Sequence, residues 1–307
     1  MTLDLTRRSM LRAAALGAAA IALPAPLLAR LREAGEIADP DHERLAAWSA
    51  TLRADGLARH DAPLGRAAVR VGELAVGSPY VAYTLEQYMR EGGSPRSREP
   101  LTLWLTRFDC VSLVESCLAV ARASEGAAAP TWARFGREVE RMRYRGGVRT
   151  NYASRLHYFS EWIADGARRG LVRDLGAELG GVADARPLRF MTEHRDKYRA
   201  LADEQLFREI AAMERRLDGA ARLVIPTARI ADVSDRIESG DVLAFATAIP
   251  GLDVTHSAFA YRDRDGVLRV LHAPLSGGTV EVSRRALPEY VAAIKRSTGI
   301  LVARPLR

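Results

Sequence analysis

LWLTRFDCVSLVESCLAVAR, residues 103–122, predicts a turn followed by a helix, and the other features of the chain can be placed around it. Asp109 is a favoured helix N-cap, and Ser112 stands at the third residue after it. Apolar side chains then recur at helical spacing, at Val111, Val114, Leu118 and Ala121. We therefore expect a helix that begins at Cys110 and buries one apolar stripe.

Cys110 would occupy the first helical position, where the free backbone N–H groups and the positive end of the helix dipole favour a negative charge. This placement is expected to lower the pKa of the thiol and to raise the fraction of thiolate, which is the nucleophilic form. A free cysteine is, however, often a small buried hydrophobic residue. From the pair Asp109-Cys110 alone, a nucleophile and a packing residue are equally good interpretations.

The chain contains two cysteines, Cys110 and Cys117. On one helix their Cα atoms would be about 10.5 Å apart, whereas a disulfide needs Cα atoms within roughly 7 Å. We therefore expect no disulfide between them. Cys117 falls on the apolar side of the helix and is expected in the core, which leaves Cys110 as a free thiol.

Residues 6–29 read TRRSMLRAAALGAAAIALPAPLLA and resemble a twin-arginine export signal. Arg7 and Arg8 precede an apolar run, Ala13 to Leu23, that is too short to span a bilayer. No cysteine follows this run as a lipid-attachment site, so we expect no stable membrane anchor. An amphipathic N-terminal helix is the alternative. We predict export to the periplasm or the exterior, with a signal peptide at residues 1–29, a helical segment at 30–65 and the main domain at 66–307.

The formal net charge is +7 and the isoelectric point about 9.8, with arginine supplying nearly all of the positive charge. Basic proteins can bind nucleic acid or anionic surfaces. Here the basic residues are scattered and no nucleic-acid-binding motif occurs, so a general preference for arginine explains the charge better. We expect no nucleic-acid partner.

Helical patterns dominate the middle of the chain, and strand patterns dominate its last part. Further helices are expected at Thr131–Arg145, Ser154–Arg169 and within Met191–Leu217, so that residues 125–229 form a helical insertion. Strands are expected at His256–Tyr261, Val267–Ala273, Val280–Val282 and Ile300–Ala303, of which the first two form a hairpin. Helices followed by an antiparallel sheet predict an α+β fold.

A cysteine nucleophile needs a base within hydrogen-bond reach, and the base needs a group that orients it. His256 opens one strand of the predicted hairpin, and His272 closes the next. On adjacent strands the two rings can lie side by side and face the end of the Cys110 helix. His256 would then accept the thiol proton while His272 fixes its tautomer. A zinc site is the weaker alternative because no HExxH or CxxC motif occurs, and we expect no metal and no cofactor.

Several motifs follow one another along the chain: GSPYVAYTLE (77–86), FDCVSLVE (108–115), GDVLAF (240–245) and THSAFAYRDRDGVLRVLHAP (255–274). Together they resemble the NlpC-type papain-like cell-wall hydrolases. RYRGG (143–147) and SRLHYFSEW (154–162) extend the resemblance to the branch of N-acetylmuramoyl-L-alanine amidases, long known only as a domain of unknown function. The resemblance covers Arg66 to Arg304 and implies a papain-like fold in which an antiparallel sheet packs on the cysteine helix.

The resemblance also implies a role for each matching residue. Cys110 would be the nucleophile, His256 the base and His272 the residue that orients the base. Tyr80 and the backbone N–H of Cys110, next to Asp109, would stabilise the oxyanion. Tyr80 could equally be an aromatic residue packed on its turn.

Four polar residues of the two later motifs are candidates for substrate binding. His157 and Arg155 are expected to face the substrate. Arg143, Arg145 and Arg155 could clamp peptide carboxylates, because a guanidinium group binds a carboxylate through two hydrogen bonds. A solvated basic face is the other interpretation of these arginines.

The expected function is cysteine-dependent hydrolysis of an amide bond in peptidoglycan or muropeptides, between N-acetylmuramic acid and L-alanine. Alternatives are cleavage between γ-D-Glu and the diamino acid, with Glu86 near the free L-Ala amine; an acyltransferase or thioesterase on the same fold; and a non-catalytic wall-binding protein. Two departures from the family pattern leave the shape of the cleft open. Tyr83 stands where a small residue, often glycine, is expected, and Pro274 stands where serine is common.

Overall fold

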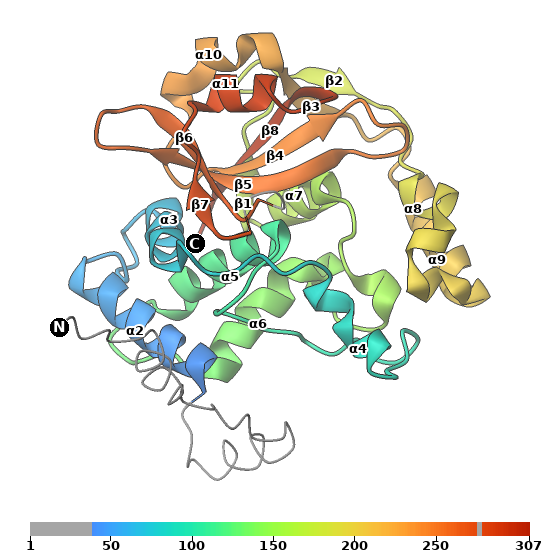
Figure 1. Ribbon diagram of the computed structural model, residues 1–307, viewed down its shortest axis with the longest axis horizontal. Coiled ribbons are helices and arrows are strands. Elements are labelled where there is room, and N and C mark those ends of the chain that lie inside the picture. Colours follow the sequence, from blue (N-terminus) through green and yellow to red (C-terminus); the bar gives the residue numbers. More distant parts are fainter. Residues whose placement is uncertain (1–38, 275–277) are drawn as a thin grey trace, which may run out of the picture. The chain divides into compact units, whose positions relative to one another are not determined.

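The computed structural model describes residues 39–274 and 278–307, and residues 40–307 form one compact unit (Figure 1). The predicted signal peptide at residues 1–29 lies outside the described residues. Residues 40–65 belong to the same unit as the rest, because helix α2 (Pro40–Ala54) contributes Leu45, Trp48 and Leu52 to the main hydrophobic core. Pro40 is the first residue of that helix, a position where its missing N–H costs nothing.

One antiparallel sheet runs through the unit, as the sequence predicts. Its strands lie in the order β2-β3-β8-β4-β5-β6-β7, and β1 also pairs with β8. The strands are β1 (Val172–Asp174), β2 (Val182–Asp184), β3 (Arg222–Pro226), β4 (Val242–Thr247), β5 (Val254–Arg262), β6 (Leu268–His272), β7 (Glu281–Val282) and β8 (Ser297–Pro305). β5 and β6 form the expected hairpin, in which Phe259 pairs with Leu271.

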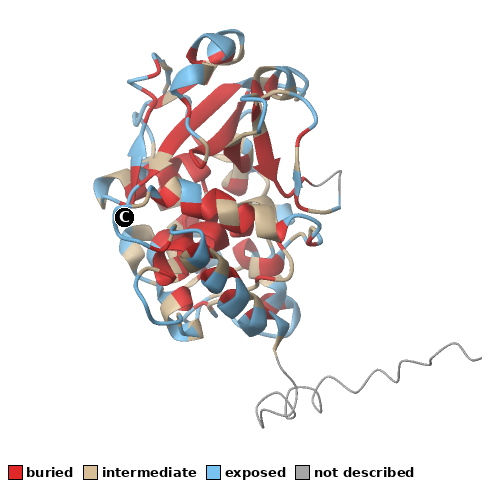
Figure 2. Cartoon of the chain, turned by 90° about the vertical axis from the view of Figure 1, so that its left-hand side faces the viewer, coloured by how far each residue is buried: buried red, intermediate tan, exposed pale blue. Residues whose placement is uncertain are grey.

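Both faces of the sheet are covered by helices. The residues of β4 are therefore buried on both sides, and almost all of them are apolar. Val242, Ala244 and Ala246 join the main core beneath helices α3 (Leu64–Ala75), α5 (Cys110–Ala123) and α6 (Trp132–Arg143). Leu243 and Phe245 point to a second core under α10 (Ile230–Val233) and α11 (Leu287–Ala292). Figure 1 shows these two helical layers on opposite sides of the sheet. Figure 2 shows buried residues concentrated in the strands and in the helices next to them.

The predicted insertion at residues 125–229 is not purely helical. It contains α6, α7 (Phe159–Arg168), α8 (Phe190–Glu193) and α9 (Glu204–Arg216), but also strands β1, β2 and β3, which extend the sheet. These three strands have only three to five residues each. That is too few to show a clear alternation of apolar and polar side chains in the sequence. A third hydrophobic cluster joins α9 to the short helix α4 (Gln87–Arg90).

Helix α7 begins at Phe159, five residues later than the sequence pattern predicts. The backbone at Arg155 is extended and pairs with Tyr144 in an isolated antiparallel bridge. The N–H of Leu156 also donates to the carbonyl of Arg143, 2.9 Å away. These contacts hold residues 155–158 out of a helix, between the 3-10 turn Tyr152–Ser154 and α7, and they place His157 in a connecting segment.

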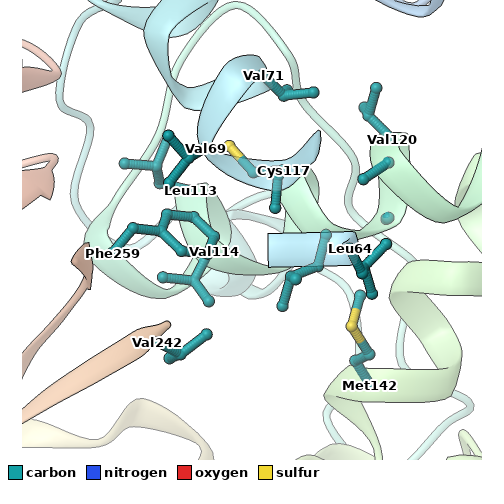
Figure 3. Packing of buried hydrophobic residues seen from close by; sticks show 14 of the residues in the cluster. Leu64, Val69, Val71, Leu113, Val114, Cys117, Val120, Met142, Val242 and Phe259 are labelled. Atoms are coloured by element: carbon teal, nitrogen blue, oxygen red, sulfur yellow. The ribbon is translucent and has the colours of Figure 1, made fainter. Parts of the chain in front are cut away.

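Helix α5 begins at Cys110 with the Asp109 cap, as residues 103–122 predict, but it is buried on all sides and not along a single apolar stripe. The Asp109 carboxylate accepts from the Ser112 N–H, and the Ser112 hydroxyl accepts from the Asp109 N–H, which closes a capping box. Every residue from Ser112 to Ala123 is buried. Both cysteines are free, and the Cys117 sulfur lies in the core between α3 and α5, near Val69 and Leu113 (Figure 3). No helix among the residues that the structure describes is long and apolar enough to cross a membrane.

Candidate active site

Cys110 is the half-buried first residue of α5, as expected, but its ionisation differs from the expectation. Burial, followed by the neighbouring Asp109 carboxylate, raises the pKa of the thiol to about 11. Hydrogen bonds from Ser257 and from the backbone of Val111 oppose this rise without cancelling it. The pKa of the thiol is therefore raised and not lowered as predicted, because burial and, after it, the charge of the capping Asp109 carboxylate outweigh the hydrogen bonds that favour the thiolate. The resting thiol is protonated at neutral pH.

His256 and Cys110 line one cavity of about 140 Å³ at the start of β5. Nε2 of His256 lies 2.8 Å from Nδ1 of His272, so the two rings are side by side as predicted. Burial lowers the pKa of His256 to about 3 and that of His272 to about 4, which keeps both rings neutral. Since Nε2 of His256 is engaged, Nδ1 is the nitrogen left to act on the thiol.

His256 lines the cavity that contains Cys110, whereas His272 contacts His256 and does not line that cavity. His256 stacks on Phe245 at 5.6 Å between ring centroids, and the Tyr290 hydroxyl is 3.4 Å from Nδ1 of His272. Nε2 of His272 is buried without a hydrogen-bond partner among the described residues, and the nearest carboxylate oxygen, on Glu281, is 3.8 Å away. Sequence analysis missed these three neighbours, because only the strand register and the packing of α11 bring them to the histidine pair.

The backbone of Tyr80 forms a short parallel bridge with Phe108, the residue before Asp109, so Tyr80 lies next to the segment that leads into α5. Burial, followed by the negative charges that Cys110 and Asp109 can carry, raises the pKa of Tyr80 to about 12. Its hydroxyl is protonated at neutral pH and can donate a hydrogen bond. The structure thus brings Cys110 and His256 from separate parts of the chain to one cavity, and it pairs the Tyr80 backbone with the segment that leads to Cys110.

A second cavity of about 230 Å³ adjoins the first, and Val111, Leu156 and His157 line both. Its other lining residues are Tyr83, Leu85, Glu86, Asp109, Glu115, Arg143, Arg155 and Tyr198. The two cavities together form a cleft that passes the N-terminus of α5. The smaller cavity combines an apolar part with Asp253 and two histidines, whereas the larger one is lined by carboxylates and arginines.

The three arginines of the later motifs are buried or half-buried and already paired, so they form neither a free carboxylate clamp nor a solvated face. Nε of Arg143 is 2.7 Å from the Glu115 carboxylate, and both side chains are almost fully buried. Arg145 binds Glu161 through two hydrogen bonds of 2.6 and 2.9 Å. A linear sequence does not show these pairs, because each carboxylate stands 16 or more residues from its arginine.

Arg155 and His157 do line the larger cavity, as expected. Arg155 is buried and lies 3.1 Å from Glu86 and 3.6 Å from Glu99. Nε2 of His157 is 2.9 Å from the Tyr152 carbonyl oxygen. Among the residues that the structure describes, no group of three or more His, Cys, Asp or Glu side chains is arranged to hold a metal ion.

A thiol at a helix start and a strand-borne histidine line one cavity, and a second histidine contacts the first, which makes a site suited to acyl transfer. The chain belongs to the N-acetylmuramoyl-L-alanine amidase-like family, which matches residues 70–300. It is therefore an enzyme, a hydrolase of amide bonds with a function related to peptidoglycan. No curated protein matches the chain.

Solved structures agree with this family. An N-acetylmuramoyl-L-alanine amidase from Bacteroides uniformis is 30% identical, with a TM-score of 0.72, over 80% of this chain and 99% of that chain. A Bacteroides fragilis protein described as a candidate xylanase is 32% identical, with a TM-score of 0.66, over 76% of this chain and 99% of its own. A Legionella pneumophila protein, 17% identical with a TM-score of 0.63 over 91% of this chain and 97% of its own, shares the fold.

Proposed function

We propose that this enzyme is a cysteine-dependent N-acetylmuramoyl-L-alanine amidase that acts on peptidoglycan or on muropeptides. The observation that carries the proposal is the shared cavity of Cys110 and His256, with Nε2 of His256 held 2.8 Å from Nδ1 of His272. In the tautomer that supports catalysis, His256 donates its Nε2–H to His272 and keeps the lone pair of Nδ1 for the thiol proton. His272 is thus a positioning residue.

The reaction starts from a neutral thiol and a neutral imidazole. As Sγ of Cys110 attacks the amide carbonyl, its proton passes to Nδ1 of His256 and a C–S bond forms. His256 then returns that proton to the leaving amine as the C–N bond breaks. Water attacks the resulting thioester while His256 takes a proton from it, and the free acid and the thiol are released. Cys110 and His256 are not hydrogen-bonded to each other in the described state, so substrate binding must bring them into reach.

Tyr80 and the backbone N–H of Cys110 would stabilise the oxyanion. The hydroxyl of Tyr80 is kept protonated by the same burial that raises its pKa to about 12. The Cys110 N–H belongs to the first turn of α5, where backbone N–H groups have no intrahelical acceptor. Two such donors aimed at one oxygen stabilise a tetrahedral intermediate more than the planar substrate.

The two cavities favour cleavage at the muramic acid–L-alanine bond. His256 must protonate the leaving amine, so the leaving half of the substrate would occupy the smaller cavity, which His256 lines. The apolar part of that cavity, formed by Leu156, Phe159 and Leu252, suits the methyl group of L-alanine. The larger cavity, with tyrosine rings and polar groups of several kinds, suits the sugar of the acyl half.

The endopeptidase alternative needs an acidic residue that is free to bind the L-Ala amine. Glu86 lines the larger cavity, but one of its oxygens already accepts from the Tyr152 hydroxyl and from Arg155, at 3.1 Å each. This pairing removes much of its attraction for an ammonium group. The cavity beside Cys110 also contains Asp253 and two histidines, which is unlike the apolar tunnel that an acyltransferase or thioesterase would need.

Mass spectrometry of a digested disaccharide-tetrapeptide tests the bond. The amidase releases a disaccharide and an intact tetrapeptide, whereas the endopeptidase releases a disaccharide-dipeptide. We expect only the first pair of products. A digest that contains only the disaccharide-dipeptide would assign the other bond to this enzyme.

Matched cysteine variants test the chemistry. Cys110→Ala should lose hydrolysis and keep the fold, because the loss is chemical. Cys117→Ala should keep hydrolysis and lose stability, because Cys117 is fully buried in the core. Iodoacetamide should inactivate the wild type, whereas a chelator should not. A Cys110→Ala protein with nearly wild-type activity would refute the thiol mechanism.

We further propose that the fold is of the NlpC-type papain-like kind, which the helix-borne cysteine and the strand-borne histidine pair support. We also propose export by the twin-arginine route. The support for export is the position of Arg7 and Arg8 directly before an alanine-rich apolar run.

A further inference from the structure

His157 lies where the two halves of the cleft meet. It lines the larger cavity together with Glu86 and Arg155, and it lines the smaller cavity together with Cys110 and His256. A group at this junction is close to the bond that the proposed reaction breaks, on the side of the acyl half. The proposed mechanism gives it no task.

The tautomer of His157 follows from its hydrogen bond. Nε2 is 2.9 Å from the Tyr152 carbonyl oxygen, and a carbonyl oxygen can only accept, so Nε2 carries the proton. The ring also packs on the Tyr152 ring at 4.5 Å between centroids, which fixes its orientation. Nδ1 is left with a bare lone pair, and none of the described residues donates a hydrogen bond to it.

The surroundings of His157 keep the ring neutral. Burial lowers its pKa well below the ordinary value, and the nearby Arg155 adds to this effect. A neutral ring with its one proton already donated cannot bind a carboxylate or a carbonyl group. Nδ1 can only accept, so it selects for an N–H or O–H donor on the substrate.

We propose that His157 is a specificity-determining residue whose Nδ1 accepts the N–H of the 2-acetamido group of muramic acid. This inference rests on the proposed function, because it places the sugar in the larger cavity. In muramic acid the acetamido group is on C2 and the lactyl ether is on the adjacent C3. The acetamido N–H is therefore a donor of the acyl half that must lie close to the lactyl carbonyl under attack by Cys110.

A pair of substrates tests the inference on the wild type. One is N-acetylmuramoyl-L-Ala-D-isoglutamine, and the other is its analogue in which the acetamido N–H is replaced by an ester oxygen. The analogue keeps the carbonyl and the shape but presents an acceptor where the donor stood. We expect kcat/KM for the lactyl–L-Ala amide bond to fall about 10- to 100-fold, because a buried acceptor loses its donor and meets another lone pair.

Two variants of similar length separate recognition from packing. His157→Gln can donate its amide N–H to the Tyr152 carbonyl and offer its amide oxygen to the substrate, so it should retain most of the discrimination. His157→Met fills the space without a nitrogen lone pair, and its ratio between the two substrates should fall below about threefold. His194→Ala is the matched control: the ring of His194 bonds the Phe190 carbonyl at 2.8 Å and stacks on Phe190, but lines neither cavity.

The outcomes are distinguishable. A wild type that cleaves both substrates equally, or a His157→Met variant that keeps the wild-type ratio, overturns the inference and leaves the amidase proposal standing. A wild type that cleaves neither lactyl–L-Ala bond but cuts after γ-D-Glu in a longer stem peptide overturns both. Should His157→Met fail to fold, as judged by its thermal melting curve, the wild-type ratio and the His157→Gln ratio still decide.

Discussion

The buried pair of Arg143 and Glu115 gives a prediction with a defined size. Replacing Arg143 with Met removes the guanidinium group that lies 2.7 Å from the Glu115 carboxylate. The Glu115 side chain is only 1% exposed, so its carboxylate would then be buried without this cation. Breaking a buried pair from one side costs roughly 3–5 kcal/mol of unfolding free energy. For a domain of this size each kcal/mol shifts the melting temperature by roughly 2 °C, so we expect a decrease of about 6–10 °C.

The loss should depend on pH in a direction that the buried carboxyl group fixes. Burial raises the pKa of Glu115 above its unfolded value, and the wild-type Arg143 opposes that rise. Without Arg143 the folded pKa rises further, so the folded protein binds a proton that the unfolded chain releases. Stability then falls as pH rises from the unfolded pKa to the folded one. The deficit of the Arg143→Met variant should therefore be smaller at pH 5 than at pH 8.

Thermal and urea unfolding at the two pH values measure the deficit, with the double variant Arg143→Met/Glu115→Gln as the control. The double variant removes the uncompensated charge and should regain most of the lost stability. A single-variant deficit below about 1 kcal/mol, or no recovery in the double variant, would refute the reasoning. Activity of the double variant bears on the site: if Arg143 clamped a substrate carboxylate, the restored fold would remain inactive, and we expect it to be active.

Three further measurements test the site and the export signal. Because burial and Asp109 raise the pKa of the Cys110 thiol to about 11, the rate of its alkylation by iodoacetamide in the free enzyme should rise about tenfold per pH unit from pH 7 to pH 9; a plateau already reached at pH 7 would show a preformed thiolate. Replacing Arg7 and Arg8 with Lys should retain the protein in the cytoplasm, and cell fractionation that shows unchanged export would point to the general secretory route. Tyr83→Gly should leave the melting temperature equal or higher yet lower kcat/KM on a muropeptide, whereas Tyr83→Phe should retain activity; a Gly variant with full activity would show that the ring contributes nothing to the cleft.

Local patterns predicted the features that depend on local interactions. The Asp109 cap with Ser112, the core position of Cys117 and the β5–β6 hairpin each follow from a few neighbouring residues, and the structure confirms all three. The closeness of His256 and His272 follows from the hairpin that carries them, so it could be predicted as well.

The remaining features depend on contacts between distant segments. The Cys110 pKa is set by how deeply the sulfur is buried, which a helix N-terminus does not reveal. The partner of Arg155, Glu86, is 69 residues away, and the late start of α7 results from a bridge to Tyr144. A sequence pattern shows how many charged residues there are and how the apolar residues are spaced. It does not show which carboxylate pairs with which arginine once the insertion folds against α5.

Tyr83 shows how a departure from a family pattern can be understood through backbone geometry. Its φ is +59° and its ψ +29°, in the left-handed region that favours glycine, which is the physical reason that a small residue is expected there.

Holding a tyrosine in this conformation costs about 1–2 kcal/mol, and burial does not offset that cost because the side chain is 62% exposed. The ring lines the larger cavity and contacts Arg90, whose guanidinium carbon lies 5.4 Å from the ring centroid. Tyr83 is thus a strained residue at the wall of the cavity, and its side chain makes little packing contact that could offset the strain. This combination favours a role of Tyr83 in binding over a role in folding. The predicted contrast between Tyr83→Gly and Tyr83→Phe separates the two, since folding would favour the glycine and a sugar-stacking surface would favour the phenylalanine.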